Sequence, residues 1–314
     1  MNEILIIGAG VIGLTTAVRL QEAGFQVSII SKTLPEQSTS AKAAAIWLPF
    51  EVEPMQQVNA WSLKSYHRFE ALAALPDSGI QMTDFLVLLG DNELPKWADA
   101  LPATAHRMAH PSELPEGYLH GRLCRVPLID TPIYLPYLLQ QFAQNGGELY
   151  LESIQSLMPL FAPERLLINC TGLGAAALTG DTSLYPIAGQ IVKIKAQDSP
   201  CIANNLPGEL AYVIPRKEGI MLGGTAERGN YREEPKAEVT AGIIQRCRSL
   251  APQLDYTELL DIQVGLRPAR PTIRLELETD RPLIHNYGHG GGGFTVSWGC
   301  AESVLDLVHQ FIRQ

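Results

Sequence analysis

The sequence predicts an α/β protein in which a doubly wound domain with a parallel sheet carries an inserted, mostly antiparallel α+β domain. A buried strand, a glycine-rich turn, a helix and a second strand follow one another near the start of the chain. Later strand patterns at 165–171 and 282–289 run into further glycine turns and helices, whereas the stretches between them alternate as antiparallel strands do. We therefore expect the first domain to be assembled from separated segments.

The composition excludes several classes of function. The 314-residue chain has a formal net charge of −9 and no polybasic run, which argues against nucleic-acid binding and against a membrane surface. No apolar run has the length of a membrane span. Five separated cysteines form no zinc-type or disulfide pattern, so we expect no metal site. The first residues lack a signal-peptide pattern, and a cytoplasmic location is expected.

Residues 3–30 have the pattern of a Rossmann-like βαβ unit. An apolar strand over 3–7 precedes a GxGxxG turn, a helix over 14–22 and a strand over 25–30. In this motif Gly8 permits the tight turn, Gly10 lets the backbone approach a pyrophosphate, and Gly13 lets helix and strand pack closely. The helix N-terminus offers N–H groups to the phosphates. The predicted dinucleotide site is Gly8, Ala9, Gly10, Val11, Ile12 and Gly13.

The second strand lacks the acidic residue that commonly binds the ribose of NAD. Ser31 and Lys32 follow the strand, and the nearest carboxylate, Glu36, lies beyond Pro35. We expect Ser31, Lys32 or backbone groups to bind the ribose. The missing acidic residue argues against NAD as the bound dinucleotide more than against FAD.

Residues 38–47 form a hydroxyl cluster, Ser38, Thr39 and Ser40, followed by small residues. Small side chains would let a flat ring system lie against the backbone. A Ser/Thr N-cap before an alanine-rich helix fits the same letters equally well.

The middle of the chain alternates between helix and strand patterns. We expect inserted helices and strands over 50–140, a helix over 134–142, and strands over 149–157 and 165–171. A strand over 185–195 then precedes a hairpin formed by 211–216 and 219–224. A helix is expected over 237–251.

Residues 264–276 contain three arginines among prolines and branched aliphatic residues. Pro268 and Pro271 remove backbone donors and exclude a regular helix. A stiff segment with several guanidinium groups suits a carboxylate bound through two parallel hydrogen bonds, although arginines paired with surface carboxylates would give the same pattern. The glycine-rich turn at 288–293 precedes a terminal helix, an arrangement that points N–H groups at an anion or a polar ring edge.

Several motifs together resemble the D-amino-acid oxidase family of FAD-dependent enzymes, which includes the D-aspartate oxidases. They occur in the family's order and span nearly the whole chain: 8–13, 38–47, 169–172, 189–190, 212–215 with 222–225, 265–276, and 285–291 with 298–300. The resemblance implies a discontinuous FAD-binding domain of 1–50, 141–184 and 266–314, and a substrate-binding domain of 51–140 and 185–265.

The resemblance also implies roles for individual residues. Arg267 would bind the substrate α-carboxylate, Tyr212 would hydrogen-bond it, and the backbone carbonyl of Gly291 would accept from the substrate amine. The expected FAD contacts are Ala44, Ala45 and Ile46 against the isoalloxazine, Ile154 and Thr171 at the adenosine or flavin tail, and Gly290, Gly291, Gly292, Gly293, Phe294 and Thr295 at the pyrimidine edge. His285 and His289 are expected to be structural hydrogen-bonding residues, Arg270 and Arg274 braces, and Cys170 and Cys300 inert core residues.

The chain departs from the family at three places. A second active-site tyrosine of the vertebrate members has no counterpart, and Gly208 stands near its position. Leu48 replaces a residue that is often polar, and Gly292 replaces a tyrosine of some members. Arginines that would bind an acidic side chain are not evident, although Arg228 is close to the 222–225 motif. We therefore expect neutral D-amino acids as substrates.

The implied reaction is oxidative deamination of a D-amino acid to a 2-oxo acid and ammonia. Hydride would pass from the substrate α carbon to flavin N5, and dioxygen would be reduced to hydrogen peroxide. No side chain is required as an acid or a base. A D-aspartate oxidase, an oxidase of glycine or N-methyl amino acids, and a non-enzymatic flavin-binding module are the alternatives. The expected partners are a small-molecule D-amino acid and dioxygen, and a homodimer is left open.

Overall fold

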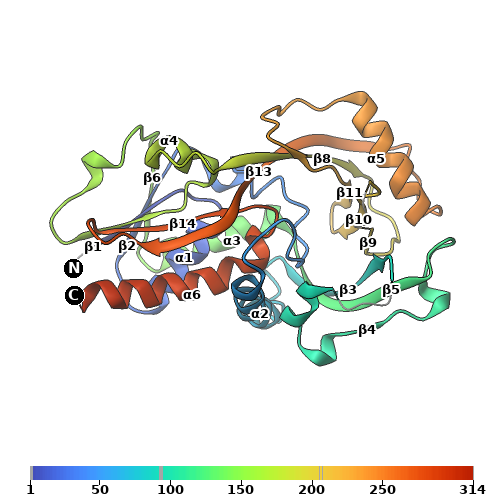
Figure 1. Cartoon of the computed structure of the whole chain (residues 1–314), viewed down its shortest axis with the longest axis horizontal. Helices are drawn as coiled ribbons and strands as arrows, with labels where there is room; N and C mark the ends of the chain where they lie inside the picture. Colours follow the sequence, from blue (N-terminus) through green and yellow to red (C-terminus); the bar gives the residue numbers. More distant parts are fainter. Residues whose placement is uncertain (1–2, 92–94, 205, 207, 314) are drawn as a thin grey trace.

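The computed structural model describes residues 3–91, 95–204, 206 and 208–313, and its helices flank one extended sheet (Figure 1). The strands are β1 (Glu3–Ile7), β2 (Val27–Ser31), β3 (Ile80–Leu89), β4 (His106–Met108), β5 (His120–Ile129), β6 (Glu148–Leu151), β7 (Arg165–Asn169), β8 (Tyr185–Ile194), β9 (Ile202–Asn204), β10 (Ala211–Arg216), β11 (Gly219–Gly223), β12 (Glu227–Arg228), β13 (Leu259–Leu277) and β14 (Leu283–His289). The helices are α1 (Val11–Glu22), α2 (Met55–Leu72), α3 (Thr131–Gln144), α4 (Ala175–Thr179), α5 (Ala237–Leu250) and α6 (Gly293–Ile312).

The strands form one sheet in the order β4-β5-β3-β9-β10-β11-β8-β13-β14-β7-β1-β2-β6, and β12 pairs with β8. From β14 to β6 the neighbours are parallel. On the other side of β14 they are antiparallel, apart from the parallel pair β3–β9. The sheet thus has a parallel half and an antiparallel half, and this division confirms the predicted fold class.

Both faces of the parallel half are covered. Ile4, Ile6 and Ile29 point to one face and join the core formed with α1, α3 and α6. Leu5 and Ile7, their neighbours along β1, point to the other face and pack with apolar residues of the 154–161 loop and α4. Because alternate residues of a strand face opposite sides, both sets must be apolar when both faces are buried.

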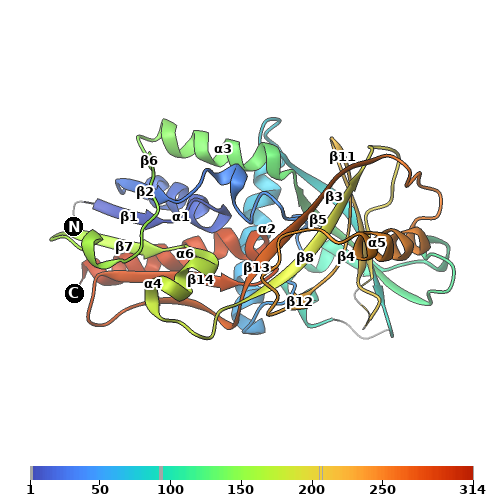
Figure 2. The ribbon, with the colours of Figure 1, turned by 90° about the horizontal axis from the view of Figure 1, so that it is seen from above.

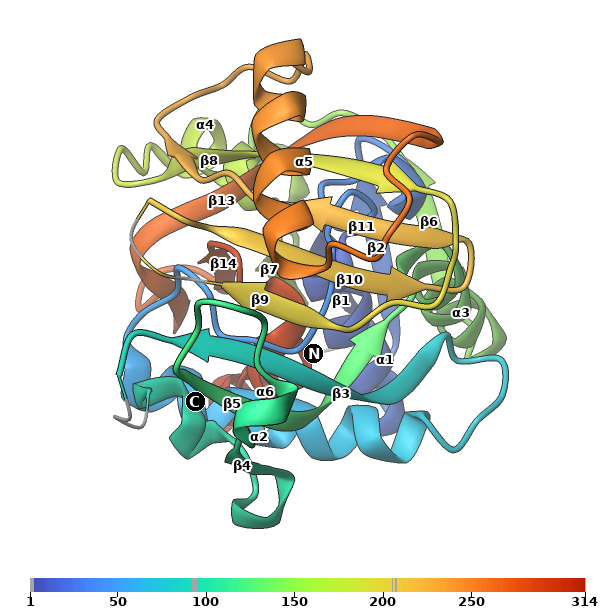
Figure 3. The same cartoon turned by 90° about the vertical axis from the view of Figure 1, so that its right-hand side faces the viewer.

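The antiparallel half has one face under α5 and one face toward the centre of the molecule (Figure 3). Val213 belongs to the cluster that packs with Ile243 and Cys247 of α5. Its neighbours on β10, Tyr212 and Ile214, point to the opposite face and line a cavity. The strand alternation of β10 therefore decides which of its side chains reach the cavity.

The two halves are joined by the long strands β8 and β13, which run side by side from one end of the molecule toward the other (Figures 1 and 2). They pair from Ala269 with Tyr185 to Leu259 with Ile194. The far part of β13 then pairs with β14. Because the sheet is continuous across this junction, the domain boundaries near residues 50, 140, 184 and 265 stay a prediction.

Two local expectations differ from the structure. The strand expected over 149–157 ends at Leu151, because its partner β2 ends at Ser31 and offers no further pairing. Residues 41–47 form no alanine-rich helix. Ala45 has a φ of 52°, outside the helical region, and the carbonyl groups of Ala43 and Ala44 accept hydrogen bonds from Arg216. The N-capped helix was therefore the wrong alternative for this segment.

Candidate active site

A cavity of about 700 Å³ lies between the two halves of the sheet. This volume is within the range of small-molecule sites, roughly 300–1,000 Å³. Of the predicted site residues, those that line the cavity are Gly8, Ala9, Gly10, Val11, Ile12, Ser31, Lys32, Ser38, Thr39, Ser40, Ala44, Ala45, Ile46, Ile154, Thr171, Tyr212, Arg267, Gly290, Gly291, Gly293, Phe294 and Thr295. Gly13 and Gly292 do not line it.

The turn between β1 and α1 forms one end of the cavity. Gly8 has a φ of +106°, and a Cβ atom there would lie 2.6 Å from the Cys170 carbonyl oxygen. A Cβ at Gly13 would lie 1.9 Å from the carbonyl oxygen of Gly8, so this glycine permits the close packing of helix and strand that the motif predicts. The Val11 N–H donates to Ser40 Oγ at 3.0 Å. No acidic residue lies in the first turn of α1, so its positive end faces the cavity unopposed.

The end of β2 contributes both expected and unexpected groups. The Ser31 hydroxyl donates to the carbonyl of Thr33 at 2.9 Å and accepts from the Ala9 N–H at 3.3 Å, so it holds the turn together. Lys32 and Glu152 line the cavity beside it. Sequence analysis missed Glu152, which follows β6 rather than β2. The β2–β6 pairing places Leu151 opposite Ser31 and so brings this carboxylate to the end of β2.

The small residues at 41–46 form a wall of the cavity. The left-handed backbone at Ala45 costs roughly 1–2 kcal/mol for a residue with a Cβ. Its carbonyl accepts from the Ile129 N–H at 2.9 Å, and Ile46 forms a β-bridge with Leu128. Arg216 binds the preceding carbonyl groups and was also missed by sequence analysis. In the sequence, the only indication of such a role is that Arg216 is a charged residue at the end of an apolar strand.

A second helix N-terminus reaches the cavity at the start of α6. The preceding turn packs tightly, because a Cβ at Gly290 would lie 2.0 Å from the carbonyl oxygen of Glu51. The Thr295 hydroxyl both accepts from the Leu48 N–H and donates to the Leu48 carbonyl. Its side chain therefore anchors the 48–51 segment. The first turn of α6 has no acidic residue.

Arg267 and Tyr212 meet at the other end of the cavity. Arg267 Nη1 donates to the Thr225 carbonyl at 2.9 Å, and the guanidinium lies 5.8 Å from the centre of the Phe50 ring. Within the described ranges no carboxylate forms an ion pair with Arg267. Burial raises the pKa of Tyr212, although the charge of Arg267 opposes the shift. The site thus offers a guanidinium and a protonated phenol to an anion.

Glycines make room for both of these side chains. A Cβ at Gly189 would lie 2.4 Å from Arg267 Nη1, and one at Gly223 would lie 2.0 Å from Tyr212 Cζ. Gly189 is on β8 next to β13, and Gly223 is on β11 next to β10. The strand pairing therefore fixes the positions of the guanidinium and the phenol.

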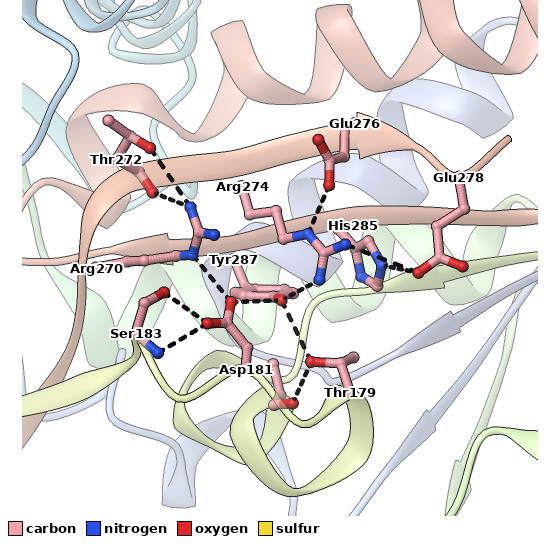
Figure 4. A network of polar contacts seen from close by, with 11 residues as sticks. Thr179, Asp181, Ser183, Arg270, Thr272, Arg274, Glu276, Glu278, His285 and Tyr287 are labelled. Atoms are coloured by element: carbon pink, nitrogen blue, oxygen red, sulfur yellow. Dashed lines mark hydrogen bonds and ion pairs between the residues drawn. The ribbon is translucent and has the colours of Figure 1, made fainter.

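The other two arginines of the 264–276 segment are braces, as expected (Figure 4). Arg270 Nε forms an ion pair with Asp181 at 2.9 Å. Arg274 donates to the Tyr287 hydroxyl at 2.8 Å and pairs with Glu276 at 2.7 Å. Burial alone would raise the pKa of Asp181, but hydrogen bonds from Ser183, Tyr287 and Arg270 hold it well below its ordinary value.

The two histidines flanking 286–288 are structural hydrogen-bonding residues, as expected. His285 Nε2 lies 2.8 Å from a Glu278 oxygen, and His289 Nε2 lies 3.0 Å from Asn286 Oδ1. Burial lowers the pKa of both and brings that of His289 to about 3, so its imidazole is neutral at physiological pH. The five cysteines are buried and unpaired, and burial raises the pKa of Cys170 and Cys300.

The cavity suits an elongated ligand with a diphosphate and a flat ring, as FAD has. The GxGxxG turn and the α1 N-terminus suit phosphates, and small residues at 43–45 leave space for a ring. The start of α6 supplies a second positive helix end. Among the described residues no group of His, Cys, Asp and Glu could hold a metal ion. No helix in the described ranges is long and apolar enough to span a membrane.

Comparisons with known proteins agree with this geometry. A family described as FAD dependent oxidoreductase matches residues 3–307. The chain is 40% identical to a D-amino-acid oxidase of Streptomyces coelicolor, over 98% of this chain and 97% of the relative. It is 37% identical to a D-amino-acid oxidase of Rubrobacter xylanophilus, over 97% and 95%, and 30% identical to the D-aspartate oxidase of Homo sapiens, over 99% and 96%. A glycine oxidase from Geobacillus kaustophilus shares the fold, with a TM-score of 0.80 at 19% identity over 99% of this chain and 95% of that one.

Proposed function

The chain belongs to the family of FAD-dependent oxidoreductases, and we propose that it catalyses the oxidative deamination of neutral D-amino acids. Arg267 carries the proposal. It is a cation that lines the cavity beside a protonated tyrosine, and it forms no ion pair with a carboxylate of the described residues. A half-buried guanidinium without an ion-pair partner is well placed to bind a carboxylate through two parallel hydrogen bonds.

FAD would be held mainly by backbone groups. The turn at Gly8–Ile12 would bind the diphosphate, Lys32 and Ile154 would lie at the adenosine end, and 44–46 would form the wall beside the ring. Gly290, Gly293 and Thr295 would offer backbone groups to the polar edge of the ring. Bound FAD would supply the oxidant, taking two electrons from the substrate and passing them to dioxygen, which leaves as hydrogen peroxide.

The chain's own contribution is to orient the amino acid. Arg267 would bind the α-carboxylate through parallel hydrogen bonds, Tyr212 would donate to the same group, and the Gly291 carbonyl would accept from the amine. Tyr212 acts as a donor rather than a base, because its raised pKa keeps it protonated. The oxidised product is an imino acid, which water converts to the 2-oxo acid and ammonia.

The lining of the cavity near Arg267 favours a neutral substrate side chain. Phe50, Ile191, Leu210 and Ile214 contribute apolar surface there. Two other cationic side chains line the cavity. Lys32 lies at the end of β2, and Lys42 forms an ion pair with Glu233 at 3.0 Å. A carboxylate on the substrate side chain would therefore be desolvated without a partner.

D-aspartate oxidation is the second candidate, because a D-aspartate oxidase is among the relatives. It would need a cation for the side-chain carboxylate. Arg228, the arginine that lies close to the 222–225 motif in sequence, is exposed and pairs with Glu51. It does not line the cavity. This placement favours the neutral substrates.

The buried, unpaired cysteines support a reducing compartment, and we place the protein in the cytoplasm. Dioxygen as the electron acceptor and a homodimer as the assembly are parts of the same proposal.

A substrate panel tests the proposal. The purified protein with FAD should release hydrogen peroxide with D-alanine and much less with D-aspartate, L-alanine, glycine or sarcosine. Preference for D-aspartate would favour the second candidate. Activity with glycine or sarcosine but not with D-alanine would exclude D-amino acid oxidation as the main function. Binding of FAD without turnover of any of these compounds would favour a non-enzymatic flavin-binding module.

A further inference from the structure

Arg216 is a buried cation for which the proposed mechanism has no use. It lies at the end of β10, four residues beyond Tyr212, and it does not line the cavity. Burial lowers its pKa to about 10, so the guanidinium stays charged at neutral pH. Its Nε atom is buried without a protein partner, and no carboxylate of the described residues forms an ion pair with it. A charge kept in such surroundings at a cost calls for a specific role.

The guanidinium is bound by backbone carbonyl oxygens of residues 43–44 and by the hydroxyl of Thr131 at the start of α3. Arg216 Nη2 donates to the carbonyl of Ala43 at 2.6 Å and also to the carbonyl of Ala44. Nη1 donates to the hydroxyl of Thr131 at 3.1 Å, and this hydroxyl donates in turn to the carbonyl of Ala41 at 3.1 Å. Three carbonyl groups of residues 41–44 are thus tied, directly or through Thr131, to one side chain.

The residue that follows this segment has an unfavourable backbone conformation, which needs support from its surroundings. Ala45 follows it with a φ of 52°, a conformation that residues with a Cβ rarely adopt. Strained conformations of this kind persist where the surroundings fix them and are concentrated at ligand sites. The same residues, Ala43, Ala44 and Ala45, line the cavity. Arg216 therefore stabilises a wall of the cavity from behind.

We propose that Arg216 is a positioning residue for FAD, which holds residues 41–44 in the shape that the cofactor ring requires and ties them to the strand that carries Tyr212. Arg216 contacts neither ligand directly. The inference rests on the proposed function, in which FAD, the cofactor of the family, occupies the cavity. Lysine cannot replace arginine fully, because one ammonium group cannot span two adjacent carbonyl groups and a hydroxyl as the planar fork does.

Equilibrium binding of FAD by the apoprotein tests this role. Arg216→Met should raise the FAD dissociation constant about tenfold or more, because hydrogen bonds from a charged donor to a cavity wall are lost. The visible absorption bands of the bound flavin should shift, since the wall beside the ring changes. Arg216→Lys should have an intermediate effect. A dissociation constant within about twofold of wild type, with an unchanged spectrum, would overturn the proposal.

Arg246 provides a matched control. Its guanidinium also donates to two backbone carbonyl groups, those of Leu210 at 3.0 Å and Gly224 at 2.9 Å, but it lies on α5 and makes no contact with 41–44. Arg246→Met should lower the melting temperature without weakening FAD binding. If both methionine variants weakened FAD binding equally, general destabilisation would explain the result and the specific role of Arg216 would be refuted.

Thr131 keeps the inference testable if Arg216→Met does not fold. Thr131→Val keeps the side-chain shape but removes the hydroxyl that joins Arg216 to Ala41, whereas Thr131→Ser keeps the hydroxyl. FAD should bind more weakly to the valine variant than to the serine variant, and equal affinities would count against the inference. Failure of the wild-type protein to bind FAD would instead refute the proposed function.

Discussion

The two ends of the cavity offer different kinds of polar group to a ligand. At the cofactor end, in the parallel half, the groups are backbone N–H donors of a turn and of two helix N-termini, and glycines create the space. At the substrate end, in the antiparallel half and at the junction, two side chains on neighbouring parts of the sheet supply the polar contacts. We therefore expect the cofactor end to be sensitive to substitutions that enlarge a glycine, and the substrate end to substitutions that remove a polar group.

The largest effect is expected from removal of the guanidinium at the substrate end. Arg267→Met should lower kcat/KM for D-alanine about a thousandfold or more, because a charge-assisted pair of hydrogen bonds to the carboxylate is lost. FAD affinity should stay near that of wild type. Arg125→Met, which removes an exposed ion pair with Asp84, is the control and should keep full activity. Substantial D-alanine oxidation by the Arg267 variant would refute the carboxylate assignment.

An added methyl group tests the cofactor end. In Gly13→Ala the new Cβ would meet the carbonyl oxygen of Gly8 at 1.9 Å, so helix α1 must move away from β1. We expect a loss of about 1–3 kcal/mol of stability, as for other overpacked sites, and clearly weaker FAD binding. Gly242→Ala in α5 is the matched control, since its nearest neighbour is the tip of a flexible arginine at 3.3 Å. Equal FAD affinity and stability in the two variants would contradict this account of the turn.

Removal of one hydroxyl should affect only the substrate end. Tyr212→Phe keeps the ring that packs on Gly223 and loses the donor to the carboxylate, so KM for D-alanine should rise about tenfold to a hundredfold. Tyr256→Phe loses a hydroxyl that donates to Cys247 and Ala251 beside α5, and it should change stability but not KM. A parallel change in KM for both variants would show that the effect at Tyr212 is not local.

The smallest effect concerns His289, a buried residue that lines the cavity. Below about pH 6.5 the unfolded chain protonates this histidine, whereas the folded protein resists protonation until about pH 3. The free energy of unfolding therefore decreases as the pH is lowered from about 6.5 toward 3, by up to about 1.4 kcal/mol per pH unit. Denaturation at pH 7.5 and 5.5 should show a weaker pH dependence for His289→Asn than for wild type. His309→Asn, at an exposed position on α6, is the control variant for the same measurement.

The sequence was sufficient where a constraint is local. The glycines of the first turn were assigned from their spacing between a strand and a helix, and Gly13 meets a contact inside this βαβ unit, the carbonyl oxygen of Gly8. Arg267 and Tyr212 were found through motifs that surround them in sequence. Their placement on one cavity confirms that the motifs lie together in space, while their roles toward a ligand stay predictions.

The remaining features depend on strand pairing and could not be predicted locally. Glu152 reaches the end of β2 only because β6 pairs with it, and Arg216 reaches 41–44 across the molecule. The alanine-rich sequence of residues 41–47 is compatible with a helix as well as with a loop. Arg216, 172 residues away from Ala44, helps to decide between them by binding carbonyl groups that a helix would have used internally.

The unbroken course of β13 has a mechanical consequence. A hinge between the two halves would have to bend both β8 and β13, which pair with each other over most of the length of β8. With such a frame, we expect substrate entry and product exit to depend on movements of side chains, for example at the ion pair of Lys42 and Glu233, both of which line the cavity.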